Sequence, residues 1–193
     1  ANSVSAHEPW FGADLSYVNE MQACGAHYAY QGETDPYAIF ARSGTNIVRV
    51  RLWNNPTWTK YSNVADVTKT IAAAKARGMK VLLDDWADGD HQIVPAAWAK
   101  LDTDAQAGAL YQFTLDTLNG LKAKGLMPDA VQVGNETNHE IMLPGDGKPT
   151  KPIDWTRNAK LFNAGISAVR DASRDSAIKP DIMLHIAQPE NVE

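Results

Sequence analysis

Short apolar runs alternate along the chain with longer segments in which apolar residues recur every three or four positions. The apolar runs with the length of β-strands are residues 10–16, 46–53, 79–84, 129–135 and 181–186. Longer segments with helical spacing lie between the second, third and fourth runs and again from Asp154 onward, and a weaker helix is expected at 37–42. Strands that alternate with helices over crossovers of this length predict a parallel α/β sheet.

Start and stop signals support the predicted helices. Asn63 can cap the first long helix, and Gly78 can end it. Leu110, Thr114, Leu118 and Leu121 share one face of the second long helix, which Gly125 and Pro128 end. The third begins at Asp154, and the spacing predicts a buried stripe of Trp155, Ala159, Phe162, Ile166 and Val169.

The alternation of side chains within the predicted strands distinguishes two architectures. In the second strand Val48, Val50 and Leu52 share one face, while Arg49 and Arg51 share the other. The fifth strand has an aliphatic face of Ile182, Leu184 and Ile186. The polar faces of the other strands combine Gly12 with Asp14, Leu82 with Asp84, and Gln132 with Gly134 and Glu136.

A doubly wound sheet buries both of its faces under helices, so two arginines in the middle of a strand would be costly there. In a (β/α)8 TIM barrel the second face is the interior, and active sites form at its C-terminal mouth. The pattern therefore favours the barrel, with a five-stranded doubly wound binding protein as the alternative.

Composition and charge narrow the class of protein. The 193 residues are 44% hydrophobic, which is enough for one sizeable core, and the net charge is −5. No run of Lys or Arg exceeds two residues, which argues against binding to nucleic acid or to an anionic membrane. The single Cys24 excludes an intrachain disulfide. The start, without Met or an apolar segment, is that expected of a mature or trimmed chain from which any signal peptide has already been removed.

The sharpest candidate for chemistry is Glu136, which follows an apolar strand and directly follows Gly134 and Asn135. A glycosidase needs a carboxyl group at the mouth as general acid/base, and a neighbouring amide to bind the sugar 2-OH. The plain alternative is a turn acid just past a strand.

Further candidates share the predicted interior or the loops after strands. Arg49 and Arg51 can orient a carboxylate across a barrel, or can form structural ion pairs with Asp14 or Asp84. His185 can contact a substrate or can be a hydrogen-bonded core residue. Aromatic rings in loops can stack on sugars or can pack under those loops, and the candidates are Trp53, Trp58, Trp86 and Trp98.

Several common signatures are absent from the sequence. There is no G-x-G-x-x-G, G-x-x-x-x-G-K, G-x-S-x-G or H-E-x-x-H, so nucleotide cofactors, α/β-hydrolase chemistry and zincin chemistry lack support. His139 with Glu140, and the acidic residues at 84, 85, 88 and 90, lack the pattern of a cation-binding loop. Neither a metal nor another cofactor is expected.

Four motifs, in order, resemble glycoside hydrolase family 53, the arabinogalactan endo-β-1,4-galactanases of a clan of (β/α)8 barrels. They occupy residues 11–16, 46–54, 86–89 and 131–136. The resemblance implies an enzyme that hydrolyses β-1,4-galactan with retention. Because this polymer cannot enter a cell intact, the resemblance also implies a secreted or periplasmic location, and we expect a monomer. It implies Glu136 as general acid/base and Asn135 as the 2-OH partner. It implies that Arg49 lies near the nucleophile, and that Asp14 and Trp86 line the cleft.

Two departures from the family pattern shape the remaining expectations. A His and a Tyr that usually follow the Leu-Asp of the third strand are missing after Leu83 and Asp84. The nucleophile of the clan follows the seventh strand, so residues 1–193 are expected to be the N-terminal part of one barrel domain, about five βα units, with the nucleophile outside it. The alternatives are a non-catalytic carbohydrate-binding fragment and another clan member, such as a β-mannanase or a cellulase.

Overall fold

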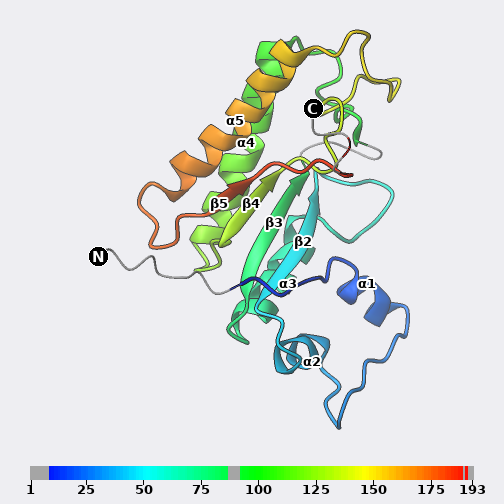
Figure 1. Cartoon of the computed structure of the whole chain (residues 1–193), viewed down its shortest axis with the longest axis vertical. Coiled ribbons are helices and arrows are strands. Elements are labelled where there is room, and N and C mark those ends of the chain that lie inside the picture. The colour runs from blue at the N-terminus through cyan, green and yellow to red at the C-terminus, as the bar shows by residue number, and fades with distance from the viewer. Residues whose placement is uncertain (1–8, 87–91, 189, 191–193) are drawn as a thin grey trace.

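In the computed structural model, which describes residues 9–86, 92–188 and 190, the chain forms one parallel sheet with helices between its strands (Figure 1). The strands are β1 (Gly12–Asp14), β2 (Ile47–Trp53), β3 (Lys80–Trp86), β4 (Ala130–Val133) and β5 (Asp181–Met183). They lie in the order β1-β2-β3-β4-β5, each parallel to its neighbour. A doubly wound sheet reverses its strand order at a switch point, so this sequential order agrees with the barrel.

The helices begin and end where local chemistry favours it. They are α1 (Val18–Ala23), α2 (Pro36–Arg42), α3 (Val64–Lys75), α4 (Thr103–Lys122) and α5 (Trp155–Ser173). The side chains of Asn63, Asp102 and Asp154 each accept a hydrogen bond from a first-turn amide of α3, α4 and α5. The sequence pattern did not predict α1, because its six residues bury only Val18. None of the helices in the described ranges is long and apolar enough to cross a membrane.

The long helices cover one face of the sheet. Val48, Val50 and Leu52 of β2 are at most 2% exposed and belong to a single core cluster with apolar side chains of α3, α4 and α5. On the opposite face, the described residues form a small apolar cluster of Ile47, Leu82 and Ala130, with Met183 packed against it. Polar side chains lie beyond it, toward the C-terminal ends of the strands. Helices on one face and polar groups on the other are typical of part of a (β/α)8 barrel, in which the second face is the interior.

The buried stripe of α5 differs from the predicted one. Trp155 is 65% exposed and Ala159 is exposed, whereas the buried residues are Asn158, Leu161, Gly165, Ala168, Val169, Ala172 and Ser173. A Cβ atom on Gly165 would lie 2.6 Å from Val133 Cγ1, so the absence of a side chain lets this face of α5 approach β4 closely. The prediction was therefore right for Val169 and wrong for Trp155 and Ala159, because a small residue rather than an aromatic one faces the sheet.

The end of the fifth predicted strand also differs. β5 ends at Met183, and Leu184 and Ile186 are 51% and 39% exposed. No helix in the described part of the chain covers this aliphatic pair. The predicted packing of their side chains is therefore not seen.

Candidate active site

Arg49 of β2 is the centre of the polar face. Its Nη1 pairs with Asp14 Oδ2 at the end of β1, and its Nη2 lies 2.6 Å from Asp84 Oδ2 on β3 and 2.6 Å from Asn135 Oδ1 after β4. Its Nε lies 3.4 Å from Gln132 Oε1 on β4. One guanidinium thus links side chains from four adjacent strands, which the planar fork of donors on arginine permits.

Both ion pairs considered for Arg49 are present, and they connect an exposed carboxylate with a fully buried one. Asp84 is 0% exposed, while the Asp14 side chain is 39% exposed. Burial opposes ionisation of Asp14, but hydrogen bonds from the Ser16 hydroxyl and backbone amide, together with Arg49, hold the pKa of Asp14 below its ordinary value. The polar layer is therefore charged and internally paired.

The turn after β4 brings Asn135 into this layer. Simple alternation places Gln132, Gly134 and Glu136 on one face and Asn135 on the other. In the structure β4 ends at Val133 and Gly134 has a φ of 78°, so the chain turns and Asn135 Oδ1 lies 3.4 Å from Gln132 Nε2. The predicted parity beyond β4 was therefore wrong, because the strand geometry stops before the Gly-Asn-Glu motif.

Asn135 is buried whereas Glu136 is exposed, which suits the different tasks expected of the two residues. Asn135 is 6% exposed, and because Arg49 donates to its Oδ1, its Nδ2 is the free end of the amide. That nitrogen donates to no residue among those the structure describes. Glu136 is exposed and lines a cavity of about 230 Å³ together with Gln92, Asn138, His139, Glu140 and Leu143. An amide donor and a carboxyl group thus lie on consecutive residues at the mouth.

His185, which follows β5, contacts the turn that follows the neighbouring strand β4. Its Nδ1 lies 3.2 Å from the Glu136 amide nitrogen and 3.1 Å from Asn135 Oδ1. Its carbonyl oxygen accepts from the Thr137 amide at 2.8 Å and from Thr137 Oγ1 at 2.9 Å. The structure therefore brings His185 together with Asn135 and Glu136.

A buried carboxylate that the sequence analysis considered only as a cation ligand organises the loop after Glu136. Glu140 is 1% exposed and accepts hydrogen bonds from the Thr150 amide at 2.7 Å, the Thr150 hydroxyl at 2.5 Å and the Asp154 amide at 3.2 Å. Arg157 of α5 donates to the carbonyl oxygens of Ile141 and Met142. A single Glu in a polar loop gives no sequence signal for such a role.

The aromatic candidates fall into different environments. The Arg51 guanidinium lies over the rings of Tyr17, at 5.7 Å, and Trp53, at 5.5 Å, and Trp58 packs edge-on against Trp53 at 5.4 Å. Trp58 is 49% exposed and Tyr17 is 55% exposed, so this cluster presents ring surface at the C-terminal end of β2. Trp98 instead packs against Phe113 and the core. The side chain of Trp86 and residues 87–89 of its motif lie outside the described part.

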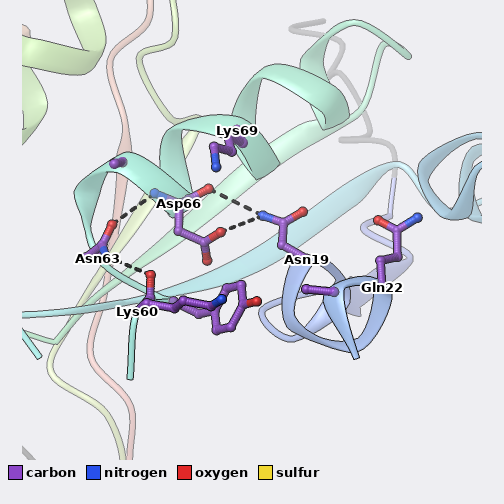
Figure 2. A pocket seen from close by; sticks show the side chains of 9 residues that line it. Asn19, Gln22, Lys60, Asn63, Asp66 and Lys69 are labelled. Atoms are coloured by element: carbon purple, nitrogen blue, oxygen red, sulfur yellow. Dashed lines mark hydrogen bonds between the residues drawn. The ribbon is translucent and has the colours of Figure 1, made fainter. Parts of the chain in front are cut away.

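A separate pocket of about 480 Å³ lies between α1 and α3 (Figure 2). Its wall contains Asn19, whose Nδ2 lies 2.8 Å from Asp66 Oδ1 and 3.1 Å from Thr70 Oγ1. The Ser62 amide donates to the other oxygen of Asp66 at 2.8 Å. These hydrogen bonds hold α1 against α3. Because α1 closely follows Asp14 in the chain, the pocket wall supports the position of Asp14 in the polar layer from outside the sheet.

No group of three or more His, Cys, Asp or Glu side chains that could hold a metal ion is found within the described ranges. Of the acidic residues considered as cation ligands, Asp88, Asp90 and the side chain of Asp85 lie outside those ranges.

Comparison with known proteins identifies the family of the chain. The model of the family described as glycosyl hydrolase family 53 matches residues 10–193. The chain belongs to glycosyl hydrolase family 53. An arabinogalactan endo-β-1,4-galactanase of Cellvibrio japonicus is 50% identical over 97% of this chain, and an endo-β-1,4-galactanase of Bacillus subtilis is 35% identical over 93%.

Solved structures of family 53 members have the same fold. A fungal β-1,4-galactanase structure matches with a TM-score of 0.78 and 32% identity, over 92% of this chain and 53% of that one. The family 53 catalytic domain of Ignisphaera aggregans matches with a TM-score of 0.77 and 30% identity, over 91% and 50%. The chain spans 52% of the Cellvibrio relative and 42% of the Bacillus relative, so about half of each relative has no counterpart in these residues.

Proposed function

We propose that this family 53 chain supplies the acid/base half of an endo-β-1,4-galactanase that cleaves β-1,4-linked galactan with retention. Glu136 protonates the leaving glycosidic oxygen and then activates water, and Asn135 Nδ2 binds the sugar 2-OH. The observation that carries the proposal is the joint placement of these residues at the C-terminal ends of the strands, with Asn135 fixed by Arg49 at 2.6 Å.

A retaining mechanism needs a second carboxylate as nucleophile, about 5–5.5 Å from the acid/base. None of the described carboxylates matches the family position of that group, and we propose that it follows a later strand of the barrel. Arg49, whose guanidinium pairs with both Asp14 and Asp84, supplies the positive charge of this polar face, on which we propose that the nucleophile lies. No metal or other cofactor is required for this chemistry.

The substrate is proposed from the names of the relatives and from the aromatic rings at the C-terminal end of β2. The ring surfaces of Trp53, Trp58 and Tyr17 lie at the end of β2 and can stack on pyranose faces. Trp86 and His185 are proposed as further cleft residues. Because polymeric galactan does not enter cells, we propose that the protein acts outside the cytoplasm, as a secreted or periplasmic monomer without membrane attachment.

The test compares Glu136→Gln with Glu20→Gln, a matched change on α1, in the protein produced from its complete coding sequence. Galactan, mannan and cellulose are offered separately, and the reducing ends released are measured. Glu136→Gln should lower kcat on galactan by about 100- to 10,000-fold, the usual contribution of a general acid/base, while Glu20→Gln should be unchanged. Galactan binding without hydrolysis in the parent protein would instead support a binding role, and faster cleavage of mannan or cellulose would overturn the substrate assignment.

A further inference from the structure

Glu136 has a backbone conformation that needs support. Its φ of 50° lies in the left-handed region, which is unfavourable for residues other than glycine and persists only where surroundings enforce it. Gly134, two residues earlier, also has a positive φ. The direction of the Glu136 side chain therefore depends on contacts that hold the turn in place.

One residue provides contacts to two successive amides of this turn. The Glu136 N–H points to His185 Nδ1, and the Thr137 N–H and hydroxyl both point to the His185 carbonyl oxygen. Two residues further along each segment, the Ala187 amide donates to Asn138 Oδ1 at 2.8 Å. The segment that follows β5 thus holds residues 136–138 from one side.

The position of the imidazole proton follows from the partners of Nδ1. The Glu136 amide is always a donor, so it requires a lone pair on Nδ1. Gln132 Nε2, 3.5 Å from Nδ1, is likewise a donor. Asn135 Oδ1, 3.1 Å from Nδ1, already receives Arg49 Nη2 at 2.6 Å and lies 3.4 Å from Gln132 Nε2, so it has no need of a third donor. A proton on Nδ1 would face the Glu136 N–H and leave that amide without an acceptor among the described residues.

We propose that His185 is a positioning residue whose neutral imidazole carries its proton on Nε2 and accepts the Glu136 N–H at Nδ1, so that ring and carbonyl together hold the left-handed turn that directs the acid/base. This inference rests on the proposed function of Glu136. It assigns His185 a task different from substrate contact, because the atom used, Nδ1, faces the protein backbone.

The two ring nitrogens can be tested separately by substitution. Asn at 185 places an amide oxygen near the position of Nδ1, whereas Gln reaches the position of Nε2. In the protein produced from its complete coding sequence, His185→Ala should lower kcat on galactan by roughly 10- to 100-fold with KM little changed, as expected when a reacting group is displaced. His185→Asn should recover most of kcat, and His185→Gln should not. A rise in KM that His185→Gln reverses would overturn the proposal in favour of substrate contact, and so would a His185→Asn variant no more active than His185→Ala.

A second measurement does not depend on activity or on the folding of a variant. In wild-type protein with ¹⁵N-labelled histidine, the neutral His185 ring should show an unprotonated Nδ1 and a protonated Nε2, and the Glu136 amide proton should show a coupling to Nδ1. A proton found on Nδ1 of the neutral ring would overturn the assignment. If galactan is not cleaved but this signature is present, the proposed function fails while the contact that positions Glu136 stands.

Discussion

Arg49 Nη2 lies 2.6 Å from Asn135 Oδ1, which ties the middle of β2 to the residue directly before Glu136. The same nitrogen lies 2.6 Å from the buried Asp84 Oδ2. Since an amide offers one acceptor end and one donor end, this contact sets the orientation of Asn135 as well as its position. Arg49 therefore links the stability of the sheet interior with the geometry proposed for sugar binding.

Replacement of Arg49 by Lys should lower both the stability of the protein and its activity on galactan. A single ammonium group keeps the positive charge but cannot reach Asp14, Asp84 and Asn135 together, so at least one of these groups loses its hydrogen bond from residue 49. We expect the free energy of unfolding to fall by about 1–3 kcal/mol, measured by urea denaturation. We also expect kcat on galactan to fall more than KM rises, because Asn135 is no longer oriented.

Arg42→Lys is the matched control for this change. Arg42 is 65% exposed and pairs with Glu33 at 3.2 Å, so its replacement should alter the free energy of unfolding by less than about 1 kcal/mol. Equal losses in both variants would contradict the special role of Arg49.

Glu140→Gln should destabilise the protein in a pH-dependent way. Burial opposes ionisation of Glu140, but hydrogen bonds from Thr150 and the Asp154 amide, with the field of Arg157, hold its pKa below the ordinary value. A depressed folded-state pKa adds stability that is fully present above the unfolded pKa, about 4.3, and is lost as the pH falls through the folded value. The variant should lose roughly 1–3 kcal/mol at pH 7, and the difference from wild type should shrink in acid.

Denaturant unfolding from pH 7 down to pH 3 measures this difference. Asp146→Asn serves as control, since the exposed Asp146 of the same loop accepts from the Lys148 amide at 3.1 Å and from no other described residue. A gap between wild type and Glu140→Gln that stays constant with pH would show that the charge of Glu140 is not what orders the loop.

Asn19→Ala should loosen α1 from α3. The change removes a donor from the buried Asp66, which is 6% exposed, and from Thr70, which is 1% exposed. We expect the free energy of unfolding to fall by about 1–3 kcal/mol. Gln22→Ala on the same helix, also facing the pocket in Figure 2, should stay within about 0.5 kcal/mol. Thermal unfolding compares the two variants, and similar losses would argue against the Asn19–Asp66 link.

The sheet and the position of Arg49 could be predicted from the sequence because they follow from repetition. Alternation over Ile47–Trp53 separates Val48, Val50 and Leu52 from Arg49 and Arg51, and the structure shows the same separation. Caps such as Asn63 likewise depend only on nearby residues. These features required no knowledge of how distant segments meet.

The parts that sequence reasoning missed depend on contacts between distant segments or on a break in repetition. Glu140 becomes a buried acceptor only because Thr150 and Asp154 return to it across the loop. Asn135 enters the polar layer only because Gly134 interrupts the strand. The exposed Trp155 reflects a rotation of α5 about its axis that Gly165 permits, and spacing alone does not fix that rotation.

Gly134→Ala should damage the site through two separable effects. A φ of 78° is unfavourable for alanine, and its Cβ would lie 2.8 Å from Thr137 Cγ2. Gly125→Ala has a similar φ of 70° with no atom within 4 Å of its Cβ, so it carries the backbone cost alone, about 1 kcal/mol. We expect Gly134→Ala to cost more than Gly125→Ala in urea unfolding and to lower kcat on galactan, because Thr137 and Glu136 share the turn. Adding Thr137→Ser removes the methyl group at 2.8 Å and leaves the contact with Ile141 Cδ1 at 3.3 Å. The double variant should therefore recover most of the stability difference from Gly125→Ala, while the cost of the positive φ remains. If Gly134→Ala and Gly125→Ala lose equal stability, the close contact with Thr137 does not constrain the turn.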